Sequence, residues 1–301
     1  MEEHEVHVTR PEKVLFPEDA LTKQQLIDYY RRVAPLMLPY LRDRPLVMQR
    51  FPDGISGEGF YQKAVAAYYP KWIERVSVKK AGGTVQHAVC NNMETLIYLA
   101  NQAAIAFHIW LSRVDKIRFP DMMAFDLDPS GDDFSLVVQT ARSLKQLLDE
   151  LSLPAYLKTT GSRGLHVVVP LDAKHDFDEV RQFSRAVAET LIANDPDRLT
   201  LEQSKSKRGG RLLLDVNRNA YAQTFVAPYS IRARAGAPIS MPLGWTALSN
   251  KRLRPDGFTV HNAFEHIKKD ADPWKDFANN PGALDPARRK LGALKSTIAI
   301  K

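Results

Sequence analysis

The stretch Met122-Met-Ala-Phe-Asp-Leu-Asp-Pro-Ser130 sets the expectation for the fold, because an apolar run leads into two aspartates and a proline. Alternate side chains of a strand share a face, so Asp126 and Asp128 should point the same way, with Phe125 and Leu127 toward the core. Neighbouring carboxylates repel each other unless a cation lies between them, and oxygen ligands suit Mg²⁺ or Mn²⁺. The alternative is a strand end at which Asp-Pro begins a turn.

Length and composition predict an ordinary globular protein. A chain of 301 residues with 44% hydrophobic residues is expected to form one large α/β domain or two coupled lobes. No apolar run is long enough to span a bilayer, and the start Met-Glu-Glu-His is unlike a signal peptide. We therefore expect a cytoplasmic protein that is not bound to a membrane.

Charge and cysteine content narrow the classes of function. Cys90 is the single cysteine, which excludes an internal disulfide and a cysteine-built zinc site. The 42 basic and 35 acidic side chains give a net charge of +7. Such a balance favours a polyanionic partner.

The first third of the chain predicts a helix start beside basic residues. Thr22 precedes Gln25 by three residues, the spacing of a capping box, and apolar residues follow at helical intervals. Arg10, Lys13 and Lys23 lie near this helix start, where backbone N–H groups and the helix dipole attract anions. Solvated surface lysines are the alternative.

Short strands are expected at 44–51 and 59–65, followed by a hairpin of 74–80 and 84–89 around residues 81–83. A helix is expected at 93–106 and a strand carrying His108 at 107–111. Phe60 and Tyr61 are adjacent on a strand and should face opposite sides, and an exposed aromatic beside a lysine can stack on a base.

The second half predicts alternating strands and helices, with helices at 134–151 and 177–193 and strands at 155–161, 165–171, 199–203 and 211–216. Residues 221–234 should be rich in strand, and the basic C-terminal segment 288–301 should fray. Trp274 and Phe277 are the expected anchors of the polar region after residue 253.

Two further features bear on the aspartate pair. Thr160-Gly-Ser-Arg-Gly164 offers backbone N–H groups, hydroxyls and a guanidinium to an anion, with His166 in the next strand; an ordinary turn is the alternative. Asp215 ends another apolar strand and could complete a cluster of three aspartates. Metal-binding carboxylates beside cations are what phosphoryl transfer requires. The nearby cations are Lys205, Lys207, Arg208, Arg211, Arg232 and Arg234.

Three motifs together resemble those of one family, the polymerase domain of bacterial DNA ligase D within the archaeo-eukaryotic primase superfamily. They are Phe125-Asp-Leu-Asp-Pro129, Lys158-Thr-Thr-Gly-Ser-Arg-Gly-Leu-His-Val-Val-Val-Pro-Leu171 and Leu214-Asp-Val-Asn-Arg-Asn-Ala-Tyr-Ala-Gln-Thr224. The similarity runs from about Thr9 to about Trp274.

The resemblance implies an α+β fold, a primase-like catalytic core with mixed or antiparallel sheets flanked by helices. It also implies a single primase-polymerase domain over 1–301. Within it, 1–92 would bind DNA ends, 93–275 would be the catalytic core and 276–301 a basic tail.

The resemblance assigns site residues by position. The metal-binding and catalytic carboxylates would be Asp126, Asp128 and Asp215. The nucleotide-binding residues would be His108, Thr160, Ser162, Arg163, His166, Lys205 and Arg232. Lys13 and Lys23 would hold the 5′-phosphate of the downstream strand, and Phe60 and Tyr61 would stack on the adjoining base.

The expected activity is template-dependent nucleotide addition at DNA double-strand breaks in non-homologous end joining. The family suggests two Mn²⁺ or Mg²⁺ ions, NTP or dNTP substrates with ribonucleotides favoured, Ku and a DNA ligase as partners, and a location at the nucleoid. One alternative is a primase or primase-polymerase of replication. The other is a non-catalytic module that joins DNA ends, in which the aspartates would be dispensable.

Overall fold

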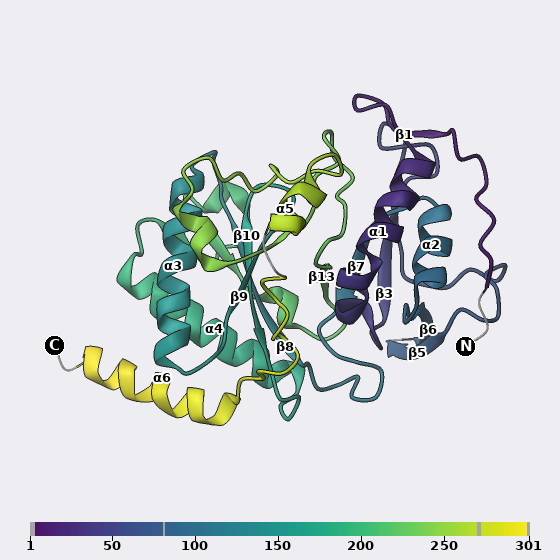
Figure 1. Cartoon of the computed structure of the whole chain (residues 1–301). Coiled ribbons are helices and arrows are strands. Elements are labelled where there is room, and N and C mark those ends of the chain that lie inside the picture. Colours follow the sequence, from purple (N-terminus) through teal and green to yellow (C-terminus); the bar gives the residue numbers. More distant parts are fainter. Residues whose placement is uncertain (1–3, 81, 270–271, 300–301) are drawn as a thin grey trace. The chain divides into compact units, whose positions relative to one another are not determined.

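The computed structural model describes residues 4–80, 82–269 and 272–299. It divides into two compact units (Figure 1). Unit 1 comprises Met1–Asp115, Thr224–Met241 and Asp256–Asp270, and unit 2 comprises Lys116–Gln223, Pro242–Pro255 and Ala271–Lys301. The units interleave along the chain, whereas the expected parts 1–92, 93–275 and 276–301 are consecutive.

Unit 1 is built on a four-stranded antiparallel sheet in the order β13-β7-β3-β4. These strands are β13 (Thr224–Val226), β7 (Ala104–Trp110), β3 (Leu46–Arg50) and β4 (Phe60–Gln62). The remaining elements are the pair β1 (Val14–Phe16) and β2 (Leu21–Thr22), the hairpin β5 (Arg75–Lys80) and β6 (Gly83–Ala88), and the helices α1 (Lys23–Leu41), α2 (Met93–Asn101) and α5 (Ala263–Lys269). Ala81 of the expected hairpin turn lies outside the described residues.

Helix α1 begins as the capping box predicts. The Thr22 side chain accepts a hydrogen bond from the Gln25 backbone N–H, and the Gln25 side chain accepts one from the Thr22 N–H at 2.8 Å. Leu26, Tyr30 and Val33 are fully buried along the expected apolar face. The Tyr30 hydroxyl donates a hydrogen bond to the Ile105 carbonyl, which fixes α1 to β7.

The expectation of a helix at 93–106 is wrong for residues 102–106. Helix α2 ends at Asn101, Ala103 adopts a left-handed φ of 56°, and β7 begins at Ala104. Because Ala104, Ile105 and Ala106 are fully buried in the sheet, tertiary pairing with β3 outweighs the helical preference of the alanines.

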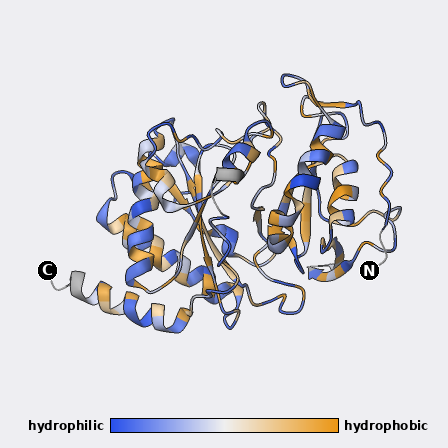
Figure 2. Ribbon diagram, viewed as in Figure 1, coloured by the Kyte–Doolittle hydropathy of each residue, from blue (hydrophilic) through white to orange (hydrophobic). Residues whose placement is uncertain are grey.

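Unit 2 is built on a six-stranded sheet in the order β11-β12-β8-β10-β9-β14. The strands are β8 (Met122–Asp128), β9 (Tyr156–Thr159), β10 (Leu165–Pro170), β11 (Leu199–Thr200), β12 (Leu212–Asp215) and β14 (Pro242–Leu243). Helices α3 (Phe134–Glu150) and α4 (Phe177–Asn194) pack against it. Orange apolar residues follow the strands, and both helices are banded in blue and orange (Figure 2). The mixed α+β expectation is confirmed.

One expectation for the last third is wrong. Residues 221–234 contain a single strand, β13, which belongs to the sheet of unit 1, and one isolated bridge between Ile231 and Ile239. The glycines and prolines that follow interrupt a longer ladder of strand hydrogen bonds. The described part of the basic tail is helical, since α6 runs from Leu284 to Ala299 and buries Leu284, Ala287 and Leu291, and the expected fraying stays a prediction. Residues 300–301 lie outside the described part. Trp274 and Phe277 are buried anchors, as expected, and their rings stack 5.0 Å apart.

A search of the described residues found no helix both long and apolar enough to cross a membrane.

We expect Thr22→Ala to lower the free energy of unfolding by about 1 kcal/mol, because the first turn of α1 loses its side-chain acceptor. Urea unfolding followed by circular dichroism measures the change. Thr22→Ser keeps the acceptor and is the matched control. Equal midpoints for Thr22→Ala and wild type would show that the cap contributes nothing.

Candidate active site and nucleic-acid interface

Four ionisable residues form one row across four neighbouring strands of unit 2. In register, Asp215 of β12 lies opposite Asp126 of β8, Asp126 opposite His166 of β10, and His166 opposite Lys158 of β9. Residues directly opposite each other share a face of the sheet, and Asp128 shares it too, being two residues from Asp126. Phe125 and Leu127 are fully buried on the other face, so the expected alternation is confirmed.

His166 links an acid and a base within this row. Its Nε2 lies 3.4 Å from Asp126 Oδ1, and its Nδ1 lies 2.7 Å from the Nζ of the fully buried Lys158. Burial alone would raise the pKa of Asp126, but the charge and hydrogen bond of His166, with Arg218 and Lys158, outweigh it and lower that pKa. Asp126 is therefore a carboxylate at neutral pH.

Asp128 is held by two arginines. Arg163 Nη2 lies 3.0 Å from Asp128 Oδ1, and Arg208 Nη1 lies 3.0 Å from Oδ2. Arg208 is buried and also donates to the Glu202 and Gln203 carbonyls at 3.0 Å each. These bonds fix the guanidinium, so the carboxylate of Asp128 is already neutralised by cations of the chain itself.

Asp215 ends β12 and is buried, as the sequence predicts. Its Oδ1 accepts a hydrogen bond from the Asn217 backbone N–H at 2.9 Å, and its Oδ2 lies 4.0 Å from Arg218 Nε. Within the described ranges, no three acidic, histidine or cysteine side chains converge closely enough to hold a metal. The three aspartates share a face and offer only oxygen donors, the chemistry that fits a hard divalent cation.

The loop 160–164 is braced by Thr160. Its buried hydroxyl donates to the Gly164 carbonyl at 3.0 Å and accepts the N–H groups of Ser162 at 3.1 Å and Gly164 at 3.2 Å. These contacts favour a role in shaping the loop, and the predicted nucleotide contact of Thr160 stays a prediction. A Cβ at Gly164 would lie 1.9 Å from the Leu127 carbonyl oxygen, so only glycine lets this loop approach β8.

Asn219, which the sequence reasoning did not single out, fixes the position of β8. Its fully buried amide accepts from the Ala124 N–H at 2.8 Å and donates to the Ala124 carbonyl at 2.7 Å. The side chain thus pairs with β8 as another strand would, two residues before Asp126. The motif 214–224 did not indicate this role, because the partner of Asn219, Ala124, lies 95 residues away. Lys158 received no role from the sequence, and Arg208 was expected only as one of the cations near the aspartates.

The other predicted nucleotide ligands fall in both units. Lys205 is exposed on the short 3-10 helix η1 (Lys205–Lys207) of unit 2, and its carbonyl accepts a hydrogen bond from the Arg208 N–H at 3.2 Å. His108 lies on β7 of unit 1 and Arg232 follows β13 in the same unit, where its N–H donates to the Pro238 carbonyl at 2.7 Å. Their contacts with a nucleotide stay predictions.

Lys13 and Lys23 have different surroundings in unit 1. Lys13 forms an ion pair with the exposed Asp53 at 2.9 Å. The buried Lys23 ammonium donates to the Thr9 carbonyl, to Thr9 Oγ1 and to Asn101 Oδ1. Burial lowers the pKa of Lys23, and the charges of Arg10 and Lys13 lower it further.

The helix start beside these lysines is already occupied by the chain itself. The Lys23 and Gln24 N–H groups donate to the Lys13 and Pro11 carbonyls, at 2.8 and 2.9 Å. The expected attraction of an anion by free N–H groups is therefore wrong for these two. A phosphate would have to be held by side chains.

Phe60 and Tyr61 lie on β4, at the edge of the unit 1 sheet, and are 46% and 56% exposed. They face opposite sides, as expected. The Tyr61 ring lies edge-on to His108 at 5.5 Å, and Phe60 lies under the Arg50 guanidinium at 5.5 Å.

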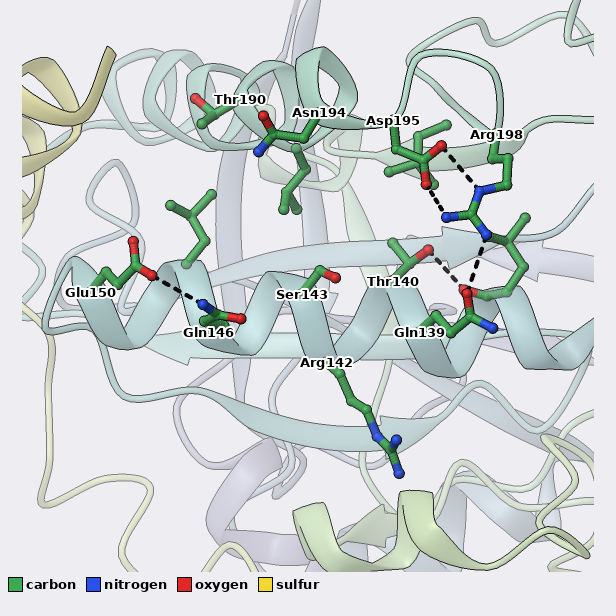
Figure 3. Close-up of a pocket in the computed structure, with 14 residues that line it drawn as sticks. Gln139, Thr140, Arg142, Ser143, Gln146, Glu150, Thr190, Asn194, Asp195 and Arg198 are labelled. Atoms are coloured by element: carbon green, nitrogen blue, oxygen red, sulfur yellow. Dashed lines mark hydrogen bonds and ion pairs between the residues drawn. The ribbon is translucent and has the colours of Figure 1, made fainter. Parts of the chain in front are cut away.

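A cavity of about 580 Å³ lies between α3 and α4 (Figure 3). It is lined by residues such as Gln139, Ser143 and Thr190 and contains none of the predicted site residues. Arg198 at its rim is engaged with Asp195 at 2.7 Å and Gln139 at 3.2 Å. The carboxylate row is the stronger candidate site, because it brings together titratable groups of opposite charge.

Comparison with known proteins identifies the family. The model of the LigD primase-polymerase domain matches residues 22–274. The chain belongs to this family. The polymerase domain of Mycobacterium tuberculosis ligase D, solved in complex with DNA, superposes with a TM-score of 0.87 at 28% identity, covering 93% of this chain and all of that one.

Two curated relatives are similar in sequence. The bifunctional non-homologous end joining protein LigD of Bacillus subtilis is 34% identical over 275 residues, covering 91% of this chain and 44% of the relative. The multifunctional LigD of Mycolicibacterium smegmatis is 32% identical over 305 residues, covering 98% of this chain and 39% of the relative. The chain thus spans less than half the length of these relatives.

We expect Asn219→Ala to lower the free energy of unfolding by about 2–6 kcal/mol, because a buried N–H and carbonyl of Ala124 lose their partners at about 1–3 kcal/mol each. Chemical denaturation of the purified variant measures the loss. Asn217→Ala, which removes a bond to the exposed Arg181, is the control and should cost less than about 1 kcal/mol. Equal losses for the two variants would contradict the pairing role of Asn219.

Proposed function

We propose that the chain is a metal-dependent nucleotidyltransferase that extends DNA ends during non-homologous end joining. The observation that carries this proposal is the row of Asp215, Asp126 and His166, with Asp128 on the same face of the sheet. Family membership and the likeness to a polymerase domain bound to DNA support it.

Asp126, Asp128 and Asp215 would hold Mg²⁺ or Mn²⁺. Bound ions of this kind lower the pKa of an attacking hydroxyl and neutralise the charge of phosphate oxygens. In the protein alone, Arg163 and Arg208 neutralise the carboxylate of Asp128. A metal ion bound to Asp128 would neutralise it in their place. Arg163, 39% exposed at its side chain, is then available for the phosphates of an NTP or dNTP.

His166 would help to orient the substrate beside the row of ionisable residues. Nε2 of His166 faces Asp126, and it carries a proton both in the charged imidazole and in the neutral tautomer whose Nδ1 accepts a hydrogen bond from Lys158. An N–H at that position can donate to a phosphate oxygen. His166 therefore binds rather than accepts a proton in this proposal.

The names of the relatives suggest the biological setting. Two LigD relatives are described as end joining proteins. We infer that this chain acts beside a DNA ligase and Ku at broken ends in the nucleoid, with preference for ribonucleotides and for Mn²⁺. The solved relative is a complex with DNA, which supports DNA as the ligand. We propose that this DNA is a double-strand-break end with a recessed 5′-phosphate.

A primase is the second candidate because it would use the same carboxylates. It would start chains without a primer, whereas an end-joining polymerase would need one. A non-catalytic end-joining module is disfavoured, since the three aspartates keep a common face and Asp126 stays ionised.

We expect Asp126→Asn to reduce nucleotide addition to a gapped duplex at least about 100-fold, because the stabilisation that a bound metal supplies is worth several kcal/mol. Primer extension in Mn²⁺ and in Mg²⁺ measures the rate, and circular dichroism verifies the fold. Asp132→Asn, at an exposed aspartate just beyond β8, is the matched control and should extend normally. Retained activity in folded Asp126→Asn would refute the catalytic assignment.

The two lysines should be separable. We expect Lys13→Ala to weaken binding to gaps with a 5′-phosphate more than to unphosphorylated gaps, without loss of stability, because its ion pair is exposed. Lys23→Ala should also lower the free energy of unfolding by about 1–3 kcal/mol, since Thr9 and Asn101 lose a buried donor.

Fluorescence anisotropy across a salt series measures the binding. The variant that combines Lys13→Ala and Lys23→Ala should have a shallower dependence of the logarithm of the binding constant on the logarithm of the salt concentration. The slope should change by about two units at most, because each neutralised phosphate contributes about 0.9. Lys174→Ala, which removes another exposed lysine paired with an aspartate, is the control. A wild type that does not distinguish phosphorylated from unphosphorylated gaps would remove this role from both lysines.

A further inference from the structure

The edge strand β4 presents two different aromatic surfaces. Gln49 pairs with Tyr61 and Arg50 with Phe60 across β3 and β4, so the two rings leave opposite faces of the sheet. Tyr61 lies with His108 on one face. Phe60 lies with Arg50 on the other, so the two rings do not form one continuous surface.

A third exposed aromatic, Tyr68, belongs to the Phe60 side. The residue is 63% exposed, more than Phe60 or Tyr61. Its hydroxyl accepts a hydrogen bond from Arg50 Nη1 at 3.3 Å and donates one to Gln102 Oε1 at 3.4 Å. The centroids of its ring and of the buried Tyr69 ring lie 5.2 Å apart in a T-shaped arrangement. The ring is therefore held in place while much of its surface faces solvent.

Arg50 connects Tyr68 to Phe60. Its Nε donates to the Gln102 carbonyl at 2.7 Å and its Nη1 to Gln62 Oε1 at 2.6 Å. These bonds fix the guanidinium between the Phe60 ring and the Tyr68 hydroxyl. Two exposed rings are thus anchored on one cation. The exposed Lys63 follows Phe60 by three residues, and the exposed Lys71 follows Tyr68 by three.

We propose that Phe60, Arg50 and Tyr68 form a second base-stacking surface, separate from Tyr61, which binds a single-stranded segment of DNA that continues beyond the duplex. Every base offers a π-face to an exposed aromatic ring, and the cations suit its phosphates. The net charge of +7 favours DNA, a polyanion, over a protein partner with few acidic residues. This inference rests on the proposed function, because it names a further part of the same DNA ligand.

Binding without nucleotide or divalent metal tests the surface separately from catalysis. The probes are a 5′-phosphorylated duplex with a single-stranded thymidine extension and the same duplex whose extension carries abasic residues. We expect the wild-type chain to prefer the thymidine extension in fluorescence anisotropy. Tyr68→Ala should reduce this preference about fivefold or more, the equivalent of about 1 kcal/mol for one stacked base.

Two further variants control the result. Tyr68→Phe keeps the ring and should keep the preference, whereas Phe119→Ala removes an exposed aromatic of unit 2 and should leave it unchanged. The proposal is overturned if Tyr68→Ala retains the wild-type preference, if it weakens both probes equally, or if the wild type has no preference. Primer extension by the wild type is measured in parallel: extension without the preference overturns this inference alone, and preference without extension overturns the proposed polymerase activity alone.

Discussion

The pairing of β8 with β10 on one side and β12 on the other is the constraint on which the candidate site depends. This register places Asp126 opposite both His166 and Asp215. A shift of one residue in either ladder would turn a functional side chain to the helical face and bring an apolar one into the row. Asn219 and Gly164 stabilise this arrangement, the first by bonding the backbone of Ala124 and the second by approaching Leu127.

The same row explains how several charges can lie on a largely buried sheet. Asp126 is stabilised by His166 and Lys158, and Asp128 by Arg163 and Arg208. Unpaired charges at such positions would be costly, because a protein interior solvates them poorly. Under the proposed function, a metal ion would take over the neutralisation that the arginines now supply, and the strands that carry the carboxylates would not have to change.

Much of the fold and part of the site could be predicted from sequence. The capping box gave the start of α1, and alternation in 122–130 gave the common face of Asp126 and Asp128. The end of α2 could not be predicted, because Ala104–Ala106 join a strand only through pairing with β3. The roles of Lys158, Arg208 and Asn219 depend on partners 8, 80 and 95 residues away, which local patterns do not contain.

Direct binding of Mn²⁺ tests the central claim, that the carboxylates of β8 and β12 form one metal site. Electron paramagnetic resonance counts free Mn²⁺ as protein is added, in the presence of a non-hydrolysable nucleotide. We predict that the wild type removes Mn²⁺ from solution and that folded Asp215→Asn binds it at least about tenfold more weakly, since one charged oxygen ligand is lost. Equal Mn²⁺ binding by wild type and Asp215→Asn would contradict the account.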